Sequence, residues 1–315
     1  EKYVTVQPSE ASAGEIEIVV RGPGLHTILF EIPLIGVPLR AFGLMVVLGF
    51  LVGTHLYGKL GDRYAVDREA EAPGFAAVPM WILVGILLGA RAMYVIVEIF
   101  RGSATGQRYL DDPMTILYYW EGGLVMYGGT FGGIALGLYA ARKYRLHLPH
   151  ALDLGLAAGF CGLAVGRVGC LLVGDDFGKV VPEGSENLPF PLTIRVPDPL
   201  PDASLFGAEN AGQVLWATQP WMSVNALALG LFGMWMIRRR RYAGQVTLVL
   251  LVLCSIGRFT IEGFRGDKIR GLWFDGMFST SQLVSLVLGS IAFILLLVFI
   301  KRREPAPVDN LAASA

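Results

Sequence analysis

An arginine lies inside a stretch that otherwise has the composition of a membrane span. Arg167 stands in the apolar run 151–173, within the segment Gly166-Arg167-Val168-Gly169-Cys170. An ionised guanidinium at bilayer depth is energetically costly, so it is rarely found there without a function. The chain then turns small and acidic, in the segment Gly174-Asp175-Asp176-Phe177-Gly178. An arginine just below a water interface, surrounded by glycines, is suited to bind a phosphate group.

Two further arginines, Arg91 and Arg258, lie in apolar runs. Because three guanidiniums cannot each face lipid, we expect all of them to converge on a polar cavity. Arg258 and Glu262 are four residues apart and share one helix face, so they can pair. This pair is either a structural ion pair or a functional arginine oriented by a carboxylate, and the sequence leaves both open. For Arg91 we favour a structural role, with Glu98 or backbone carbonyls as partners.

The glycine-rich segment 122–133 offers two kinds of contact. The pairs Gly122-Gly123 and Gly128-Gly129 flank a membrane entry, where free backbone N–H groups could approach a phosphate. The stripe formed by Gly129, Gly133 and Gly137 favours close helix packing instead. Tyr127 between the two pairs is either an interfacial belt tyrosine or a hydroxyl aimed at the ligand.

Composition places the chain among integral membrane proteins. Of its 315 residues, 54% are hydrophobic and 17% are charged, whereas soluble domains usually carry more charge. The net charge of zero gives no reason to expect nucleic acid as a partner. The three cysteines show no paired spacing, so we expect neither a metal site nor a disulfide framework, and no cofactor. Residues 1–35 lack the basic start and short apolar core of a signal peptide.

The hydrophobic pattern predicts an all-α integral membrane protein with about seven transmembrane helices. The apolar runs are 41–58, 79–100, 123–141, 151–173, 221–237, 245–264 and 279–300, of which the third and fifth are the weakest. Residues 1–40 alternate weakly and predict a short strand-rich N-terminal segment. Prolines make 174–220 an extended, turn-rich loop domain. The predicted parts are therefore 1–40, helices one to four in 41–173, the loop domain 174–220, helices five to seven in 221–300, and a tail 301–315.

Charge bias predicts the orientation. Lys and Arg are dense in the connections 59–78, 142–150 and 238–244 and in the tail, and sparse in the intervening segments. The denser set should face the cytoplasm. The N-terminus and the loop domain would then be periplasmic, with the C-terminus cytoplasmic, in a bacterial inner membrane.

These stretches together resemble one family, the bacterial phosphatidylglycerol–prolipoprotein diacylglyceryl transferases. The resemblance runs from about 35 to 300 and is most specific around Arg167. The other matching stretches are Ile35-Gly36 with Phe42-Gly43-Leu44-Met45, Gly89-Ala90-Arg91, Trp120-Glu121-Gly122-Gly123 with Tyr127-Gly128-Gly129, the segment 258–265, and Ser279-Thr280-Ser281-Gln282-Leu283. The chain also departs from the family at five positions, where the family usually has a different, polar side chain. These positions are Phe42, Tyr127, Cys170, Val173 and Gln219.

The resemblance implies transfer of the diacylglyceryl group of phosphatidylglycerol to the lipobox cysteine thiol of prolipoproteins, with glycerol phosphate released. This is the first step of lipoprotein modification. Its partners would be phosphatidylglycerol, prolipoprotein signal peptides and membrane lipids. Arg167 and Arg258 would stabilise the charge that develops on the phosphate, with Tyr127 as the third catalytic residue. Substrate contacts are expected from Gly122, Gly123, Gly128, Gly129, Gly169, Cys170, Asp175, Gly178, Glu262 and Arg265.

The sequence leaves open which residue acts as the base that deprotonates the thiol. Asp175 or Glu262 could serve, or local positive potential could lower the thiol pKa. Because several polar side chains of the family are replaced, the alternative is a non-catalytic paralogue that binds phospholipid or lipoprotein signal sequences. A transporter would show matched broken helices in two halves, and we find no such internal repeat.

Overall fold

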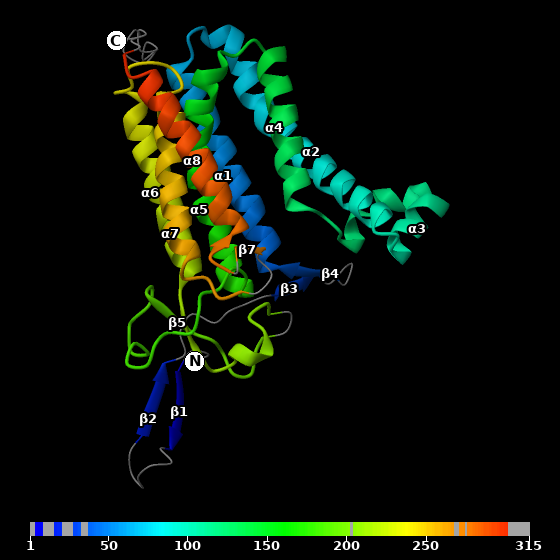
Figure 1. Cartoon of the computed structure of the whole chain (residues 1–315), viewed down its shortest axis with the longest axis vertical. Coiled ribbons are helices and arrows are strands. Elements are labelled where there is room, and N and C mark those ends of the chain that lie inside the picture. Colours follow the sequence, from blue (N-terminus) through cyan, green and yellow to red (C-terminus); the bar gives the residue numbers. More distant parts are fainter. Residues whose placement is uncertain are drawn as a thin grey trace. The chain divides into compact units, whose positions relative to one another are not determined.

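The computed structural model describes residues 4–8, 16–20, 28–32, 37–201, 204–267, 271–274 and 276–301. Of the predicted tail 301–315, all but Lys301 therefore lies outside the described residues. The α-helices, shown in Figure 1, are α1 (Ala41–Tyr64), α2 (Arg68–Phe100), α3 (Ala104–Asp111), α4 (Met126–Lys143), α5 (Leu148–Val173), α6 (Thr218–Ile237), α7 (Gln245–Glu262) and α8 (Thr280–Val298).

Six helices of the described chain are long and apolar enough to cross a membrane, namely α1, α2, α5, α6, α7 and α8. The chain is therefore a multi-pass membrane protein. The third predicted run does form a helix, α4, but α4 is not one of these six. Its 18 residues include five glycines, whose bare backbone contributes little to hydropathy. A helix this rich in glycine is suited to pack tightly against protein.

The prediction that residues 59–78 form a connection between two helices is wrong for most of that range. Helix α1 continues to Tyr64 and α2 already begins at Arg68. The Asp67 carboxylate caps α2 by accepting a hydrogen bond from Ala70 N (3.2 Å), and acidic residues in the first turn favour a helix N-terminus. These polar helical turns carry no apolar signal, so hydropathy alone cannot detect them.

The chain divides into two compact units. The first comprises Glu1–Gly53, Gly159–Phe232 and Leu248–Ile300, and the second comprises Thr54–Ala158, Gly233–Thr247 and Lys301–Ala315. In the first unit α1 packs on α5 through glycines, because a side chain at Gly49 would meet the carbonyl oxygen of Gly162 at 2.5 Å. The N-terminal part of that unit contains two hairpins, β1 (Val4–Pro8) with β2 (Ile16–Val20) and β3 (Ile28–Ile32) with β4 (Val37–Arg40).

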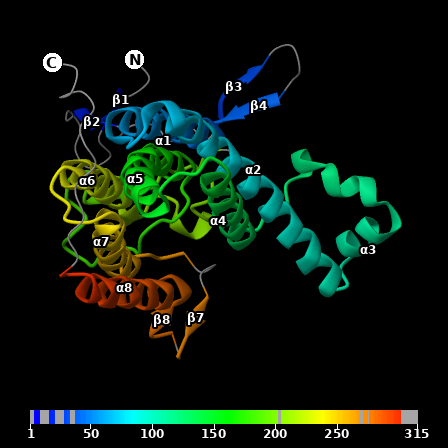
Figure 2. The same cartoon turned by 90° about the horizontal axis from the view of Figure 1, so that it is seen from above.

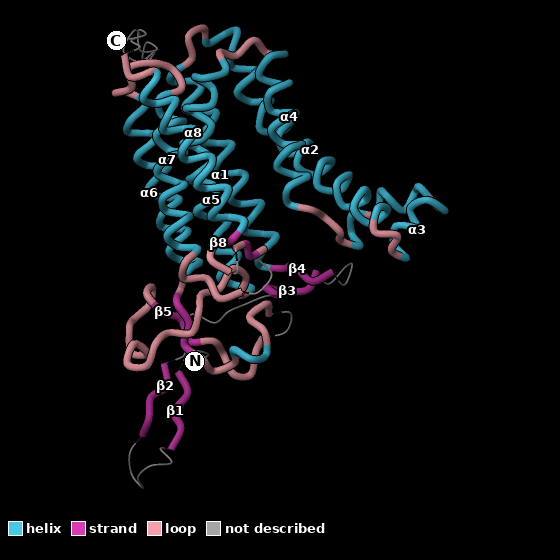
Figure 3. Tube along the Cα trace, in the orientation of Figure 1, coloured by secondary structure: helices cyan, strands magenta, loops and turns pink. Residues whose placement is uncertain are grey.

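The segment between α5 and α6 is mostly loop, as Figure 3 shows. It carries the antiparallel strands β5 (Thr193–Arg195) and β6 (Val214–Trp216) and a short 3-10 turn, η3 (Ala208–Asn210). Val196, Phe206 and Leu215 form its buried core. A further antiparallel pair, β7 (Leu272–Trp273) with β8 (Phe278–Ser279), leads directly into α8 (Figure 2).

In the second unit α2 and α4 run side by side (Figures 1 and 2) and touch backbone to backbone. A Cβ at Gly85 would lie 2.2 Å from the carbonyl oxygen of Gly132, and one at Gly89 would lie 2.3 Å from that of Gly128. The predicted stripe of Gly129, Gly133 and Gly137 lies beside this seam. Side chains added there would meet isoleucines of α2.

A buried ion pair organises the other end of the same unit. Asp153, which is fully buried, accepts hydrogen bonds from Arg240 Nη1 (2.5 Å), Gly244 N (2.8 Å) and Thr247 N (2.7 Å). Arg240 Nη2 also contacts His150 Nδ1 at 2.6 Å. The connection between α6 and α7 is thereby tied to the start of α5.

Candidate functional site

The site is assembled where the ends of α5 and α7 meet in the first unit. The strand-like segment after α5 pairs with the segment after α7 through an isolated bridge between Gly178 and Arg265. Gly266 N donates to Phe177 O (2.9 Å) beside this bridge. A side chain at Gly178 would lie only 2.2 Å from the carbonyl oxygen of Trp216, so only glycine lets the three segments come together.

Asp176 lies between two guanidiniums. Its Oδ2 accepts a hydrogen bond from Arg167 Nη1, and its Oδ1 lies 2.6 Å from Arg265 Nη2. The charge of Arg258 also acts on this carboxylate. Burial raises the pKa of Asp176, but the nearby positive charges outweigh it, so its pKa lies below the ordinary aspartate value. Asp176 is therefore a carboxylate held ionised by arginines.

Arg258 is fixed by contacts from three helices. Its Nη2 lies 3.0 Å from Glu262 Oε2 and donates to Ser281 Oγ (3.2 Å), while its Nη1 contacts Met222 Sδ at 3.3 Å. The predicted pair between Arg258 and Glu262 is confirmed. Glu262 is 1% exposed and also pairs with Arg265 Nη1 at 3.3 Å, so one carboxylate joins two arginines.

Arg265, also predicted as a site residue, is the most heavily paired cation of the group. Besides Asp176 and Glu262, it binds Asp267 through Nε (2.9 Å) and Nη2 (2.6 Å). Burial lowers the pKa of Arg265, but these carboxylates raise it above its ordinary value. Its role within the described site is to join carboxylates to each other.

Asp175 has a different environment from its neighbour. Its Oδ1 accepts from Asp176 N (2.9 Å), and within the part of the chain that the structure describes no ion pair involves it. Burial, and then the charge of Asp176, raise the pKa of Asp175 above the ordinary value. Two buried residues at the start of α6 hold the backbone here: Gln219 Nε2 donates to Asp175 O (2.9 Å) and Thr218 Oγ1 donates to Asp176 O (2.7 Å).

Two further predicted residues accompany Arg167 on α5. Cys170 is buried, and its sulfur accepts a contact from Arg167 Nη1 at 3.7 Å. A side chain at Gly169 would lie 2.9 Å from the Cβ of Met45, so this glycine lets α1 approach the helix that carries the arginine. The replaced position Phe42 belongs to the same contact.

Arg91, in the second unit, has a complete set of carbonyl partners. Its five N–H groups donate to five backbone oxygens at 2.6–3.2 Å, namely those of Thr115, Ile116, Tyr118, Gly122 and Gly123. The structural alternative with carbonyl partners is confirmed, and Glu98 instead accepts from Ser103. Because no N–H of Arg91 is left for a phosphate, its expected place among the converging cations is wrong.

The predicted residues Gly122, Gly123, Gly128, Gly129 and Tyr127 all belong to this second unit. Gly122 and Gly123 have positive φ values of 82° and 76°, which glycine adopts without strain, and their carbonyls face Arg91. Gly128 is in the seam with α2, and Gly129 packs beside it. Tyr127 is 49% exposed in the first turn of α4. Their predicted substrate contacts stay predictions.

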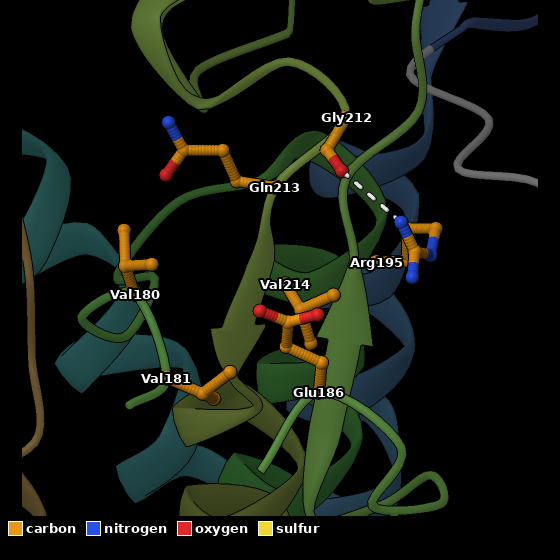
Figure 4. Close-up of a pocket in the computed structure, with 7 residues that line it drawn as sticks. All are labelled: Val180, Val181, Glu186, Arg195, Gly212, Gln213 and Val214. Carbon is orange, nitrogen blue, oxygen red and sulfur yellow. Dashed lines mark hydrogen bonds between the residues drawn. The ribbon is translucent and has the colours of Figure 1, made fainter. Parts of the chain in front are cut away.

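A shallow pocket of about 200 Å³ lies in the segment between α5 and α6 and is shown in Figure 4. It is lined by Val180, Val181, Glu186, Arg195, Gly212, Gln213 and Val214. Arg195 points to the backbone of Gly212 and donates to its carbonyl oxygen at 3.4 Å. None of the predicted site residues lines this pocket, so it is separate from the arginine cluster.

Sequence reasoning missed the carboxylates Asp176 and Asp267 and the buried Thr218, and it identified Gln219 only as a replaced position of the family. Asp176 stands in the segment that drew attention to Arg167, but only Asp175 matched the family pattern. The signal that could have found it is the pair of carboxylates directly after the apolar run that contains an intramembrane arginine. Asp267 follows Arg265 by two residues, a spacing that carries no helical or strand pairing rule.

Comparison with known proteins gives a consistent result. The family model described as prolipoprotein diacylglyceryl transferase matches residues 27–298. The chain is 30% identical over 257 residues to phosphatidylglycerol–prolipoprotein diacylglyceryl transferase 2 of Clostridium perfringens, covering 80% of this chain and 87% of that protein. It is 28% identical over 270 residues to phosphatidylglycerol–prolipoprotein diacylglyceryl transferase of Geobacter sulfurreducens, covering 85% of this chain and 93% of that protein. It is 30% identical over 261 residues to the Synechococcus elongatus protein, covering 81% of each.

Proposed function

The chain belongs to the prolipoprotein diacylglyceryl transferase family, and from that premise we propose that it alkylates prolipoproteins. It transfers the diacylglyceryl group of phosphatidylglycerol to the thiol of the lipobox cysteine. The observation that carries the proposal is the group of three guanidiniums, from Arg167, Arg258 and Arg265, joined by the carboxylates of Asp176 and Glu262 at the ends of α5 and α7. Such a group is suited to an anionic headgroup at a membrane surface.

The reaction balances without a cofactor. The cysteine sulfur attacks the terminal glyceryl carbon, a C–S bond forms, and the C–O bond to the phosphate breaks. The thiol proton passes to a base, and glycerol phosphate leaves. The phosphate changes from one negative charge to nearly two, so fixed guanidiniums stabilise the transition state more than the ground state.

Asp175 is the better candidate for the base. Glu262 is fully buried between Arg258 and Arg265, so protonating it would break two ion pairs. Asp175 has no such partners among the described residues, and burial already favours its protonated form. A carboxylate with a raised pKa takes a thiol proton more readily than an ordinary one.

We also propose the finer topology. If α4 counts as a seventh span, the two termini lie on opposite sides of the membrane. The charge bias of the connections then favours a periplasmic N-terminus and α5–α6 segment, with the C-terminus in the cytoplasm of a bacterial inner membrane. The site then faces the side where secreted lipoproteins emerge. A cysteine at position 186 should react with an impermeant maleimide in intact spheroplasts, and one at 239 should not. The reverse labelling would contradict this orientation.

The decisive experiment is transfer in reconstituted membranes, with phosphatidylglycerol and a lipobox peptide. Arg167→Ala and Arg258→Ala should each abolish transfer while inserting normally. Arg167→Lys should also fail, because an ammonium cannot bind two phosphate oxygens in parallel. Arg195→Ala, in the separate pocket of the segment between α5 and α6, is the matched control and should stay active.

A second candidate function is a non-catalytic paralogue that binds phospholipid or signal sequences. The observation that favours it is the set of non-polar or altered side chains at Phe42, Tyr127, Cys170 and Val173. Complementation of a strain depleted of its own diacylglyceryl transferase separates the two. Growth on the wild-type chain supports the enzyme, and failure with normal membrane insertion supports the binding protein.

A further inference from the structure

Five charged side chains form one continuous series of ion pairs from Arg258 to Arg167. Arg258 pairs with Glu262 (3.0 Å), Glu262 with Arg265 (3.3 Å), Arg265 with Asp176 (2.6 Å), and Asp176 with Arg167. Signs alternate along the series. The two arginines that the proposed function assigns to the phosphate are thus the two ends of one network.

Asp176 is the rigid link of this series. It adopts a positive φ of 55°, which for a residue other than glycine is uncommon and needs support from its surroundings. That support is visible, because its backbone N–H donates to Asp175 Oδ1 and its carbonyl accepts from the buried Thr218. Its second oxygen is bound to Arg265, which Asp267 and Glu262 hold in turn.

Arg167 uses only one nitrogen of its guanidinium, Nη1, in these contacts. Its Nη1 donates to Asp176 and to Cys170, whereas Nε and Nη2 have no hydrogen-bond partner among the described residues. The side chain is 23% exposed. A guanidinium carries parallel N–H groups on its Nε–Nη2 edge, which is the geometry that binds two oxygens of one phosphate.

We propose that Asp176 is a positioning residue, which binds Nη1 of Arg167 and so presents the Nε–Nη2 edge to the lipid phosphate. This inference rests on the proposed function and deepens it. The competing idea is that Asp176 occupies the phosphate's place and must leave. The structure argues against it, because leaving would break the contact with Arg265 and take one carboxylate away from that buried cation.

The test uses Asp176→Asn with Asp267→Asn as its control. An asparagine has one acceptor oxygen in place of the two carboxylate oxygens that face Arg167 and Arg265, and it carries no charge, so the hold on Arg167 is weakened. Asp267 shares Arg265 with Asp176 but makes no contact with Arg167 in the described structure. In reconstituted membranes we expect kcat to fall about ten- to hundredfold in Asp176→Asn, as for loss of one hydrogen bond to a charged group. Asp267→Asn removes a partner of Arg265 alone, and Arg265 keeps Asp176 and Glu262, so kcat should fall by less than in Asp176→Asn.

Binding of glycerol phosphate, the released headgroup, gives a second readout that needs no turnover. Calorimetry should show weaker binding to Asp176→Asn than to the wild type and Asp267→Asn. If Asp176→Asn fails to insert, Asp176→Glu carries the same expectation, because one added methylene shifts the carboxylate away from Arg167.

Two results would overturn the inference. Tighter glycerol phosphate binding with undiminished kcat in Asp176→Asn would make Asp176 a competitor of the phosphate. Equal losses of kcat in Asp176→Asn and Asp267→Asn would show that Asp176 acts only by holding Arg265 in place. A wild-type chain that binds glycerol phosphate but transfers nothing would refute the proposed function, while the binding comparison still decides the role of Asp176.

Discussion

Replacing Arg91 by lysine should destabilise the protein through the carbonyls that the arginine serves. Arg91 is 2% exposed, and its five N–H groups meet five backbone oxygens within 115–123. An ammonium has three donors, so at least two carbonyls lose their partner. Each buried acceptor left unsatisfied costs about 1–3 kcal/mol, which gives a loss of about 2–6 kcal/mol in unfolding free energy. Such a loss is a large share of a typical stability of about 5–15 kcal/mol.

Thermal unfolding in detergent measures the global effect, and limited proteolysis of the 103–123 segment measures the local one. Arg91→Lys should unfold at lower temperature and be cleaved faster in that segment. Arg101→Lys on the same helix is the control, since Arg101 is exposed and its nearest carboxylate oxygen, on Glu98, is 4.0 Å away. Wild-type unfolding and proteolysis of Arg91→Lys, together with lost transfer, would refute the reasoning and make Arg91 a substrate-binding residue.

Three further outcomes are expected. Tyr127→Phe should lower the transfer rate about ten- to hundredfold if the tyrosine hydroxyl donates to the substrate. Tyr127→His should retain or raise the transfer rate. If Tyr127→Phe transfers at the wild-type rate in the same assay, Tyr127 is only an interfacial residue. Arg240→Ala should lower the unfolding free energy by about 3–5 kcal/mol, because Asp153 then stays buried without its cation, whereas chemical denaturation should show no change for the exposed Arg241→Ala. The pH–rate profile should rise on the acid side with an apparent pKa above the ordinary aspartate value of 3.8, because burial raises the pKa of Asp175 and only its ionised form accepts the proton; Asp175→Asn should abolish this rise, and an unchanged profile would exclude Asp175 as the base.

The parts of the fold that follow from apolar run length could be predicted from the sequence. Six of the seven predicted runs correspond to helices able to span a membrane. The polar turns of α1 and α2 around Asp67 could not be predicted, because they are stabilised by capping and not by burial in lipid. The glycines of α4 are visible in the sequence, but their packing partners are not. Which residues they contact depends on the helix that lies opposite, and only the structure shows that Gly128 contacts Gly89.

For the candidate site, single residues could be predicted and their pairing could not. Arg167, Arg258 and Glu262 are recognisable because each is a charge in an apolar run. Arg91 has the same signal, yet its partners come from a segment whose carbonyls leave no trace in the sequence. Asp176 was missed because its second partner, Arg265, approaches only through the bridge at Gly178.

That bridge also has a consequence for how the protein is made. Gly178 and Asp176 are synthesised well before Arg265, which follows α7. Until α7 has been inserted, the carboxylate of Asp176 has only Arg167 to compensate it. Arg167 would then lack the link to Arg258 altogether. A chain stalled or truncated before residue 265 therefore carries the signature arginine without a formed site. The site would therefore be complete only once α7 and the segment that follows it have been synthesised.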